Sequence, residues 1–183
     1  MQTEIIFAGF GGQGVLTAGK FLAQAGMDEG KEVCWMPSYG PEMRGGTANC
    51  TVVLSERRIG SPIIANPKVA VAMNLPSLDK FEPTVVPGGL VIINSSLIER
   101  SANRDDVDVL LVPANKMAID LGSAKVANII ILGALLGRMP LVKQETIRKL
   151  IEKTFGKKKP ELVETNFKAL EAGINLGKDG GGK

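Results

Sequence analysis

Hydrophobic residues occur along the chain as short apolar runs that alternate with stretches of helical spacing. The first run, residues 4–8, stops at a cluster of glycines, and residues 13–27 then place Val15 and Phe21 on one face. A second apolar run follows at residues 32–35. This order predicts a strand, a glycine turn, a helix and a second strand. Crossovers of this kind are parallel and right-handed in nearly all known sheets.

The rest of the chain continues this pattern. Residues 47–54 favour a strand, and residues 55–58 predict a hairpin tip from which the chain returns through Ile59. Further strands are expected at residues 69–73, 90–93 and 107–112. Helices are expected at residues 76–81, 115–121, 125–136, 143–155 and 161–172. The sequence therefore predicts an α/β fold, a doubly wound, mostly parallel, Rossmann-like sheet with helices on both faces. It adds a β-hairpin and an irregular loop after the second strand.

The end of the chain differs in composition from the rest. Residues 177–183 hold four glycines and three charged residues, which is typical of a disordered tail. No linker or internal repeat marks a second domain. We therefore expect a single domain over residues 1–176, followed by the tail.

The composition excludes several kinds of chemistry. The 183 residues carry a formal charge of +3, no histidine and two cysteines, Cys34 and Cys50. Histidine-based catalysis and four-cysteine ligation of zinc or an iron–sulfur cluster are excluded for the chain alone. We take both thiols as buried apolar residues and expect no catalytic residue and no metal site. The small charge and short apolar runs do not indicate nucleic-acid or membrane binding, so we expect a cytoplasmic protein.

The glycine turn has the spacing of a dinucleotide-binding loop, with glycines at positions 9, 11 and 14. Such glycines let the backbone approach a pyrophosphate, which then lies at the N-terminus of the next helix. A dehydrogenase of this type also needs an acidic residue at the end of the second strand, and this chain has Trp35 and Met36 there. A nicotinamide or flavin enzyme is disfavoured for that reason. The remaining alternatives are a phosphate site and glycines that only allow close packing of helix on strand.

A second irregular segment, residues 37–46, follows the second strand and holds the only tyrosine, Tyr39. Loops at the carboxyl ends of parallel strands form the ligand crevice of such sheets, so we expect this segment and the glycine turn to open on the same side. Glu42 and Arg44 could pair with each other, or Arg44 could bind a phosphate or a partner's carboxylate. The length of the segment favours a function over a plain surface loop.

These two segments together resemble a known family. Residues 9–15 (GFGGQGV), 38–46 (SYGPEMRGG) and 122–128 (GSAKVAN) are similar to the gamma subunit of pyruvate, 2-oxoglutarate or branched-chain 2-oxoacid:ferredoxin oxidoreductases. The resemblance covers about residues 4–175. Its one departure is Ser123, which stands where we expect an asparagine.

The resemblance implies a subunit that has no redox activity alone. The complete enzyme of this family oxidatively decarboxylates a 2-oxoacid, forms an acyl-CoA and reduces ferredoxin. Partner subunits are expected to be alpha, beta with thiamine diphosphate, and a ferredoxin-like delta, with the iron–sulfur clusters also on partners. Coenzyme A is the expected substrate at this subunit, which would bind no cofactor tightly and could form a homodimer when isolated. The alternatives are a purely structural interface subunit and, less favoured, a stand-alone dinucleotide-binding protein.

The expected site follows from the two segments. Backbone N–H groups at residues 12–14 should bind a phosphate-bearing part of coenzyme A, because the first turn of a helix has unpaired donors and a favourable dipole. Side chains beside them could add an amide, a hydroxyl and a guanidinium. The residues of this predicted phosphate site are Gly11, Gly12, Gln13, Gly14, Thr17 and Arg44. A ligand or interface role is expected for Ser38, Tyr39, Glu42, Gly45 and Asn128.

Overall fold

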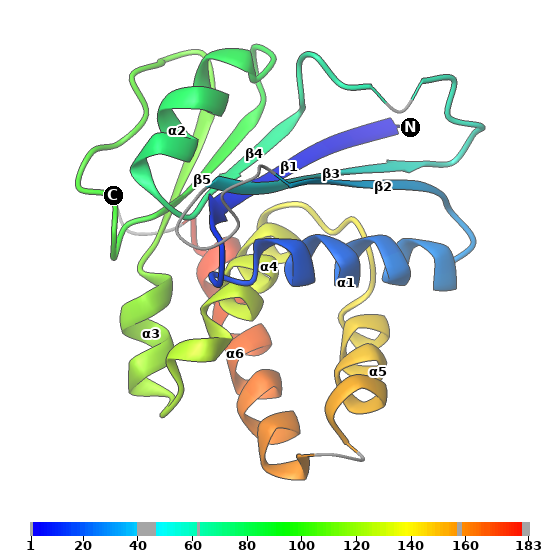
Figure 1. Ribbon diagram of the computed structural model, residues 1–183, viewed down its shortest axis with the longest axis vertical. Coiled ribbons are helices and arrows are strands. Elements are labelled where there is room, and N and C mark those ends of the chain that lie inside the picture. The colour runs from blue at the N-terminus through cyan, green and yellow to red at the C-terminus, as the bar shows by residue number, and fades with distance from the viewer. Residues whose placement is uncertain (1, 40–46, 62, 157–158, 181–183) are drawn as a thin grey trace.

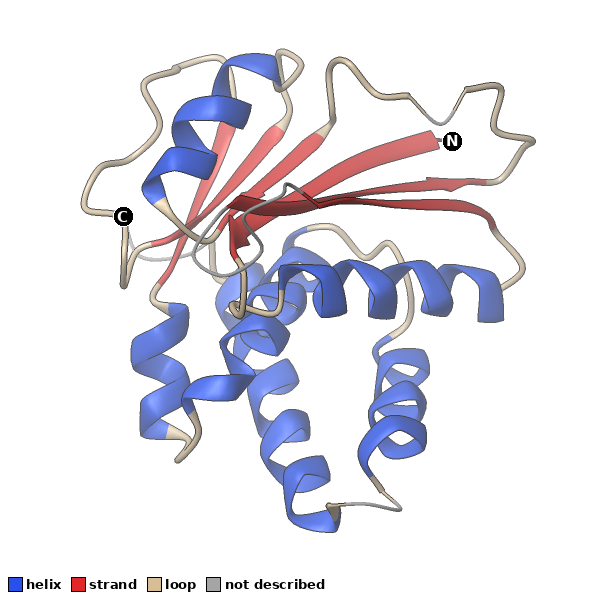
Figure 2. Cartoon of the chain, in the orientation of Figure 1, coloured by secondary structure: helices blue, strands red, loops and turns tan. Residues whose placement is uncertain are grey.

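The computed structural model describes residues 2–39, 47–61, 63–156 and 159–180. A six-stranded sheet has helices on both faces, and its strands stand in the order β2-β3-β1-β4-β5-β6 (Figures 1 and 2). The strands are β1 (Gln2–Phe10), β2 (Glu32–Tyr39), β3 (Thr47–Ser55), β4 (Val69–Ala72), β5 (Leu90–Asn94) and β6 (Asp108–Val112). The helices are α1 (Val15–Asp28), α2 (Leu75–Phe81), α3 (Ala114–Asp120), α4 (Ala127–Arg138), α5 (Gln144–Phe155) and α6 (Pro160–Lys178), with short 3-10 turns η1 (Glu82–Thr84) and η2 (Ala124–Val126).

The central strands are apolar on both faces because helices or loops cover both. Every residue of β4 and of β5 is buried, as is usual for strands inside a parallel sheet. One core contains α1 and α3–α6, which lie below the sheet in Figure 1, together with the sheet face that they cover, and a smaller core joins α2 to the opposite face. The predicted doubly wound α/β fold with helices on both faces is confirmed.

The position of β3 differs from the expectation. It lies between β1 and β2 and runs antiparallel to both, so the crossover through α1 joins two parallel strands that are not neighbours. β2 and β3 pair as neighbours, and residues 40–46 between them lie outside the described residues. The hairpin tip expected at residues 55–58 is wrong, because β3 ends at Ser55 and residues 56–61 form no strand. Pairing between strands depends on partners distant in sequence, which the local pattern does not specify.

Helices α4 and α6 approach each other through glycines on both sides. A Cβ atom added to Gly133 or Gly137 would meet backbone of α6, and one added to Gly173 or Gly177 would meet backbone of α4. This contact lets two buried helices pack at a short distance, with backbone against backbone. Helix α6 is also longer than expected. Residues 177 and 178 are helical where we expected the tail to begin.

In the part of the chain that the structure describes, none of the helices has the length and apolar character to span a bilayer.

Candidate functional site

The chain leaves two neighbouring strands toward opposite faces of the sheet. After β1 it enters α1 on one face, and after the adjacent parallel strand β4 it enters α2 on the other. A crevice forms at such a point outside the carboxyl ends of the strands, and ligands of doubly wound folds bind there. The glycine turn after β1 and residues 73 and 74 after β4 therefore flank the expected position of a ligand.

The turn between β1 and α1 is closed by the side chain of Gln13. Its backbone N–H donates to the carbonyl of Phe10 at 3.2 Å, and its Oε1 accepts from the Phe10 N–H at 2.6 Å. Its Nε2 donates to the carbonyl of Met73 at 3.2 Å, which fixes the turn to the end of β4. We expected the Gln13 N–H and amide to contact a ligand, but the N–H and both ends of the amide bond the protein itself. Gln13 thus shapes the turn.

Gly14 begins α1 in a left-handed conformation and lies close to α4. Its φ is 75°, and an added Cβ would meet the side chain of Asn128. The Nδ2 of Asn128 donates to the Gly14 carbonyl at 3.2 Å. Gly12 has a φ of 95° and open space where a Cβ would point. The two glycines therefore differ: Gly14 permits both a backbone conformation and a close contact, whereas Gly12 permits the conformation alone.

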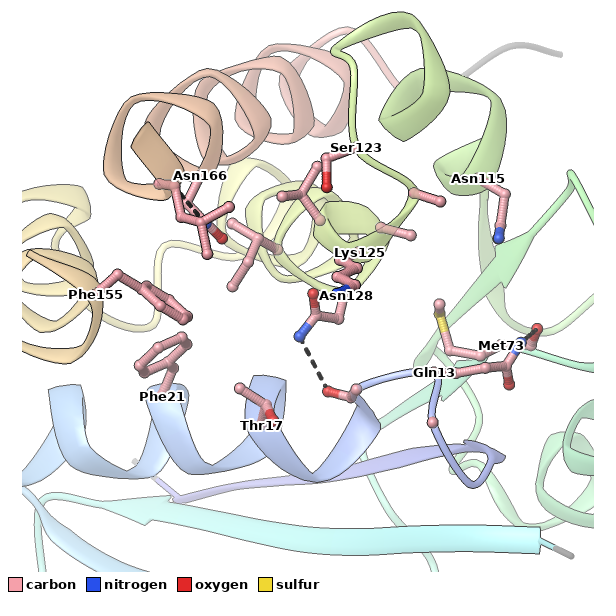
Figure 3. Close-up of a pocket in the computed structure, with 17 residues that line it drawn as sticks. Gln13, Thr17, Phe21, Met73, Asn115, Ser123, Lys125, Asn128, Phe155 and Asn166 are labelled. Carbon is pink, nitrogen blue, oxygen red and sulfur yellow. Dashed lines mark hydrogen bonds between the residues drawn. The ribbon is translucent and has the colours of Figure 1, made fainter. Parts of the chain in front are cut away.

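A cavity of about 450 Å³ opens beside this turn (Figure 3). It is bounded by the start of α1, by the segment that leads into α4, and by the facing ends of α5 and α6. The residues that line it are Gly12, Gln13, Gly14, Thr17, Phe21, Met73, Asn115, Ser123, Ala124, Lys125, Val126, Ala127, Asn128, Ile129, Phe155, Leu162 and Asn166. No carboxylate is among these lining residues.

Two helix N-termini border this cavity: that of α1, and that of α4, which continues directly from the 3-10 turn η2, where the Val126 N–H donates to the Ser123 carbonyl at 3.2 Å. Helix α1 has 14 residues and α4 has 12, and neither has a side-chain cap or an acidic residue in its first turn. The first N–H groups of a helix have no partner inside it, and the helix dipole adds a partial positive charge there. Lys125 of η2 and Thr17 of α1 also line the cavity, and their side chains carry an ammonium and a hydroxyl group. This arrangement suits an anion such as a phosphate.

The far wall of the cavity is aromatic and amide in character. The rings of Phe21 and Phe155 meet edge to face with centroids 6.4 Å apart. Asn166, which is buried in α6, donates from Nδ2 to the carbonyl of Leu162 at 2.7 Å and so leaves its Oδ1 as an acceptor. Asn94 at the end of β5 donates to Oδ1 of Asn115 at 2.7 Å, which leaves the Asn115 Nδ2 as a donor.

The structure brings most of the predicted phosphate site together. Gly12, Gln13, Gly14, Thr17 and Asn128 all line the cavity. Gly11 is exposed in the same turn but is not part of the lining. Arg44, Glu42 and Gly45 lie outside the described residues, so their predicted roles stay predictions.

The end of β2 lies at the same edge of the sheet as the glycine turn. Tyr39 pairs with Ala48 of β3, and Gly9 of β1 pairs with the same residue from the other side. The expectation that the second segment begins on the side of the glycine turn is confirmed for this flank. Ser38 is exposed on β2 and does not line the cavity.

Several lining residues were missed from the sequence. Met73 and Asn115 follow the carboxyl ends of β4 and β6, so their position after a predicted strand was a usable signal. Asn166 stands at a buried position of α6, and a polar residue on the apolar face of a helix is another such signal. Lys125 carries no comparable signal, because exposed lysines are common.

The two cysteines are free and lie away from the cavity lining. Cys50 is buried under α1 and donates to the Val15 carbonyl at 3.6 Å. Burial raises the pKa of the Cys50 thiol to about 12, and the neighbouring Trp35 side chain opposes this only in part. Cys34 is only half-buried, contrary to the expectation of a buried residue. Among the described residues, no group of three or more His, Cys, Asp or Glu is placed to hold a metal.

Comparison with known proteins agrees with the resemblance seen in the motifs. Residues 4–176 match the family model of pyruvate ferredoxin/flavodoxin oxidoreductase. The chain is 40% identical over 179 residues to the ketoisovalerate oxidoreductase subunit VorA of Methanothermobacter thermautotrophicus, an alignment that covers 97% of the chain and 37% of VorA. The chain therefore spans little more than a third of the length of this curated relative.

Two solved structures share the fold. The gamma subunit of a keto/oxoacid ferredoxin oxidoreductase from Geobacter sulfurreducens PCA is 28% identical with a TM-score of 0.81, over 97% of this chain and 99% of that one. The 2-oxoglutarate:ferredoxin oxidoreductase of Magnetococcus marinus, solved with 2-oxoglutarate, coenzyme A and succinyl-CoA bound, is 25% identical with a TM-score of 0.90, over 97% of this chain and 31% of that one. On the match over residues 4–176, the chain belongs to the pyruvate ferredoxin/flavodoxin oxidoreductase family.

Proposed function

We propose that the chain is the gamma component of a 2-oxoacid:ferredoxin oxidoreductase and that its cavity binds a phosphate-bearing part of coenzyme A. The observation that carries this proposal is the convergence of two uncapped helix N-termini, those of α1 and α4, on a cavity whose lining holds no carboxylate. The Magnetococcus relative, whose structure contains coenzyme A, supports the choice of ligand.

The chemistry assigned to the chain is binding and positioning. The first N–H groups of α1 and of η2, the 3-10 turn that continues into α4, would hold the diphosphate, with the Lys125 ammonium neutralising part of its charge. With the N–H of Gln13 bonded to Phe10, these donors replace the set first expected at residues 12–14. The 2-oxoacid reacts on thiamine diphosphate of a partner subunit in this proposal, and electrons leave through iron–sulfur clusters of partners to ferredoxin. The chain itself moves no electron.

A surface for partner subunits lies beside the cavity. Phe10 is the last residue of β1, and Leu75 and Leu97 follow the carboxyl ends of β4 and β5. These three residues are 39%, 43% and 50% exposed. Apolar residues gathered at one edge of a sheet favour contact with another protein surface. We infer that alpha, beta and delta components of a cytoplasmic enzyme cover this edge, so that coenzyme A reaches the thiamine site from the cavity.

A pair of glycine substitutions tests the ligand site. Gly12 and Gly30 both have positive φ, 95° and 78°, and both have open space at the Cβ position. Changing either to alanine should cost about 1 kcal/mol of stability for the same reason, the left-handed backbone. Only Gly12 lines the cavity. We expect Gly12→Ala to raise the Kd for coenzyme A about tenfold, measured by calorimetry on the full chain, and Gly30→Ala to leave it unchanged.

In the assembled enzyme, Gly12→Ala should raise the KM for coenzyme A while the KM for the 2-oxoacid stays the same. Equal Kd values for the two variants, or no binding of coenzyme A to the unaltered protein, would contradict the proposal and favour a purely structural subunit.

A further inference from the structure

A second cavity of about 440 Å³ adjoins the first along α1. The two share Thr17 and Phe21, so together they form one groove that begins at the glycine turn and continues between α1 and α5. The added walls come from Lys20 and Gln24 of α1 and from Leu150, Lys153 and Thr154 of α5. The groove is therefore longer than a diphosphate requires.

The second cavity is positively charged. Lys20 and Lys153 reach it from two facing helices, and no carboxylate lines it. Among the described residues neither lysine forms an ion pair, although Arg100, Arg104, Arg138 and Lys168 all do. The nearby carboxylate of Asp28 already accepts from Gln24 at 2.9 Å. Two ammonium groups without a counter-charge, at the end of a groove that already suits an anion, indicate a second anionic group on the same ligand.

The spacing separates the two anion positions. Lys20 lies six residues after Gly14, which is about 9 Å along the axis of α1. Lys20 lines the second cavity and not the first. The aromatic pair of Phe21 and Phe155 stands between the two positions. The ligand thus needs two anionic groups on either side of a body that can contact an aromatic surface.

We propose that Lys20 and Lys153 bind the ribose 3′-phosphate of coenzyme A and make the chain distinguish coenzyme A from dephospho-CoA. This inference rests on the proposed function, since it places the diphosphate at the N-termini of α1 and α4. In coenzyme A one ribose carries the diphosphate, the adenine and the 3′-phosphate, which matches a groove with two anion positions around an aromatic pair. Dephospho-CoA has the same diphosphate and lacks the 3′-phosphate.

The test compares both ligands on two variants that remove the same charge. The first is Lys20→Gln with Lys153→Gln. The control is Lys116→Gln with Lys178→Gln, because these exposed lysines line neither cavity. Calorimetry at low ionic strength gives the Kd of coenzyme A and of dephospho-CoA for the full chain and both variants. We expect the unaltered chain and the control to bind coenzyme A about tenfold more tightly than dephospho-CoA.

The Lys20→Gln, Lys153→Gln variant should bind both ligands equally, with the Kd that the unaltered chain shows for dephospho-CoA. Equal binding of the two ligands by the unaltered chain, or a preference that persists in this variant, would overturn the inference and leave the proposed function standing. Failure of the unaltered chain to bind either ligand would overturn both. Gly12→Ala serves as a cross-check, because it should weaken both ligands and keep their ratio.

Discussion

Glycines face each other across the contact of α4 and α6, whereas Gly12 and Gly14 of the turn before α1 line a cavity. In the first region an added Cβ meets backbone of the neighbouring helix at Gly133, Gly137, Gly173 and Gly177. In the second, Gly12 has open space and only its φ of 95° requires glycine. The difference separates two meanings of one residue type. Glycine in a contact serves stability, and glycine with positive φ beside open space leaves backbone accessible to a ligand.

The largest effect is expected at the helix contact. Gly173→Ala places a methyl group on the carbonyl of Ile130, so the two helices must separate. We expect a loss of about 3 kcal/mol in the free energy of unfolding, measured with urea. Gly60→Ala is the control, because nothing lies near its Cβ position and its φ is not in the left-handed region. That variant should be neutral or gain less than about 1 kcal/mol. Similar losses for both variants would remove the distinction between the two regions.

Gly14 has both a left-handed backbone and a close contact with Asn128, and a double-mutant cycle with Asn128 can separate these two reasons for glycine. Gly14→Ala should cost about 3 kcal/mol, from the left-handed backbone and from the clash with the Asn128 amide. Asn128→Ala alone loses the bond to the Gly14 carbonyl, about 1 kcal/mol. The double variant should cost about 1 kcal/mol less than the sum, because the clash and the hydrogen bond share one side chain. Strict additivity in urea unfolding would show that backbone conformation alone selects glycine here.

The smallest effect appears only at alkaline pH. Gly19 of α1 lies on Cys50, and this close packing excludes water from the thiol, whose pKa is raised to about 12 from 9.0. The unfolded thiol ionises near pH 9 while the folded thiol stays protonated. The contribution of the buried thiol to the free energy of unfolding is therefore fully present below pH 9 and is lost as the pH rises toward 12. By pH 10.5 the loss should be about 2 kcal/mol.

Cys50→Ala is the reference for that measurement, because every other titrating group remains in it. The difference in unfolding free energy between the two proteins should shrink from pH 8 to pH 10.5. A difference that stays constant over this interval would mean that water reaches the thiol.

The sequence was sufficient to predict the strands and helices but not all of the contacts between them. Apolar runs and helical spacing predicted the order of strands and helices, and the glycine turn predicted Gly12, Gln13, Gly14 and Thr17, which all line the cavity. The antiparallel insertion of β3 was missed, because its register with β1 joins residues such as Phe7 and Cys50 that are far apart in the chain. The hydrogen bond of the Gln13 side chain was missed for the same reason, because it donates to the carbonyl of Met73, which is far away in the chain. Lys20 and Lys153 line one cavity only because α5 packs on α1.

The central place of β1 in the sheet has a consequence for biosynthesis. Ile5 pairs with Val52 of β3 on one side and with Val69 of β4 on the other, so β1 leaves the ribosome before either of its neighbours. Until β4 emerges, the apolar residues of β1 have one bare edge, and unpaired apolar strands associate readily with other chains. Nascent chains that stop before β4 should therefore need a chaperone, and release of the completed chain should remove that need.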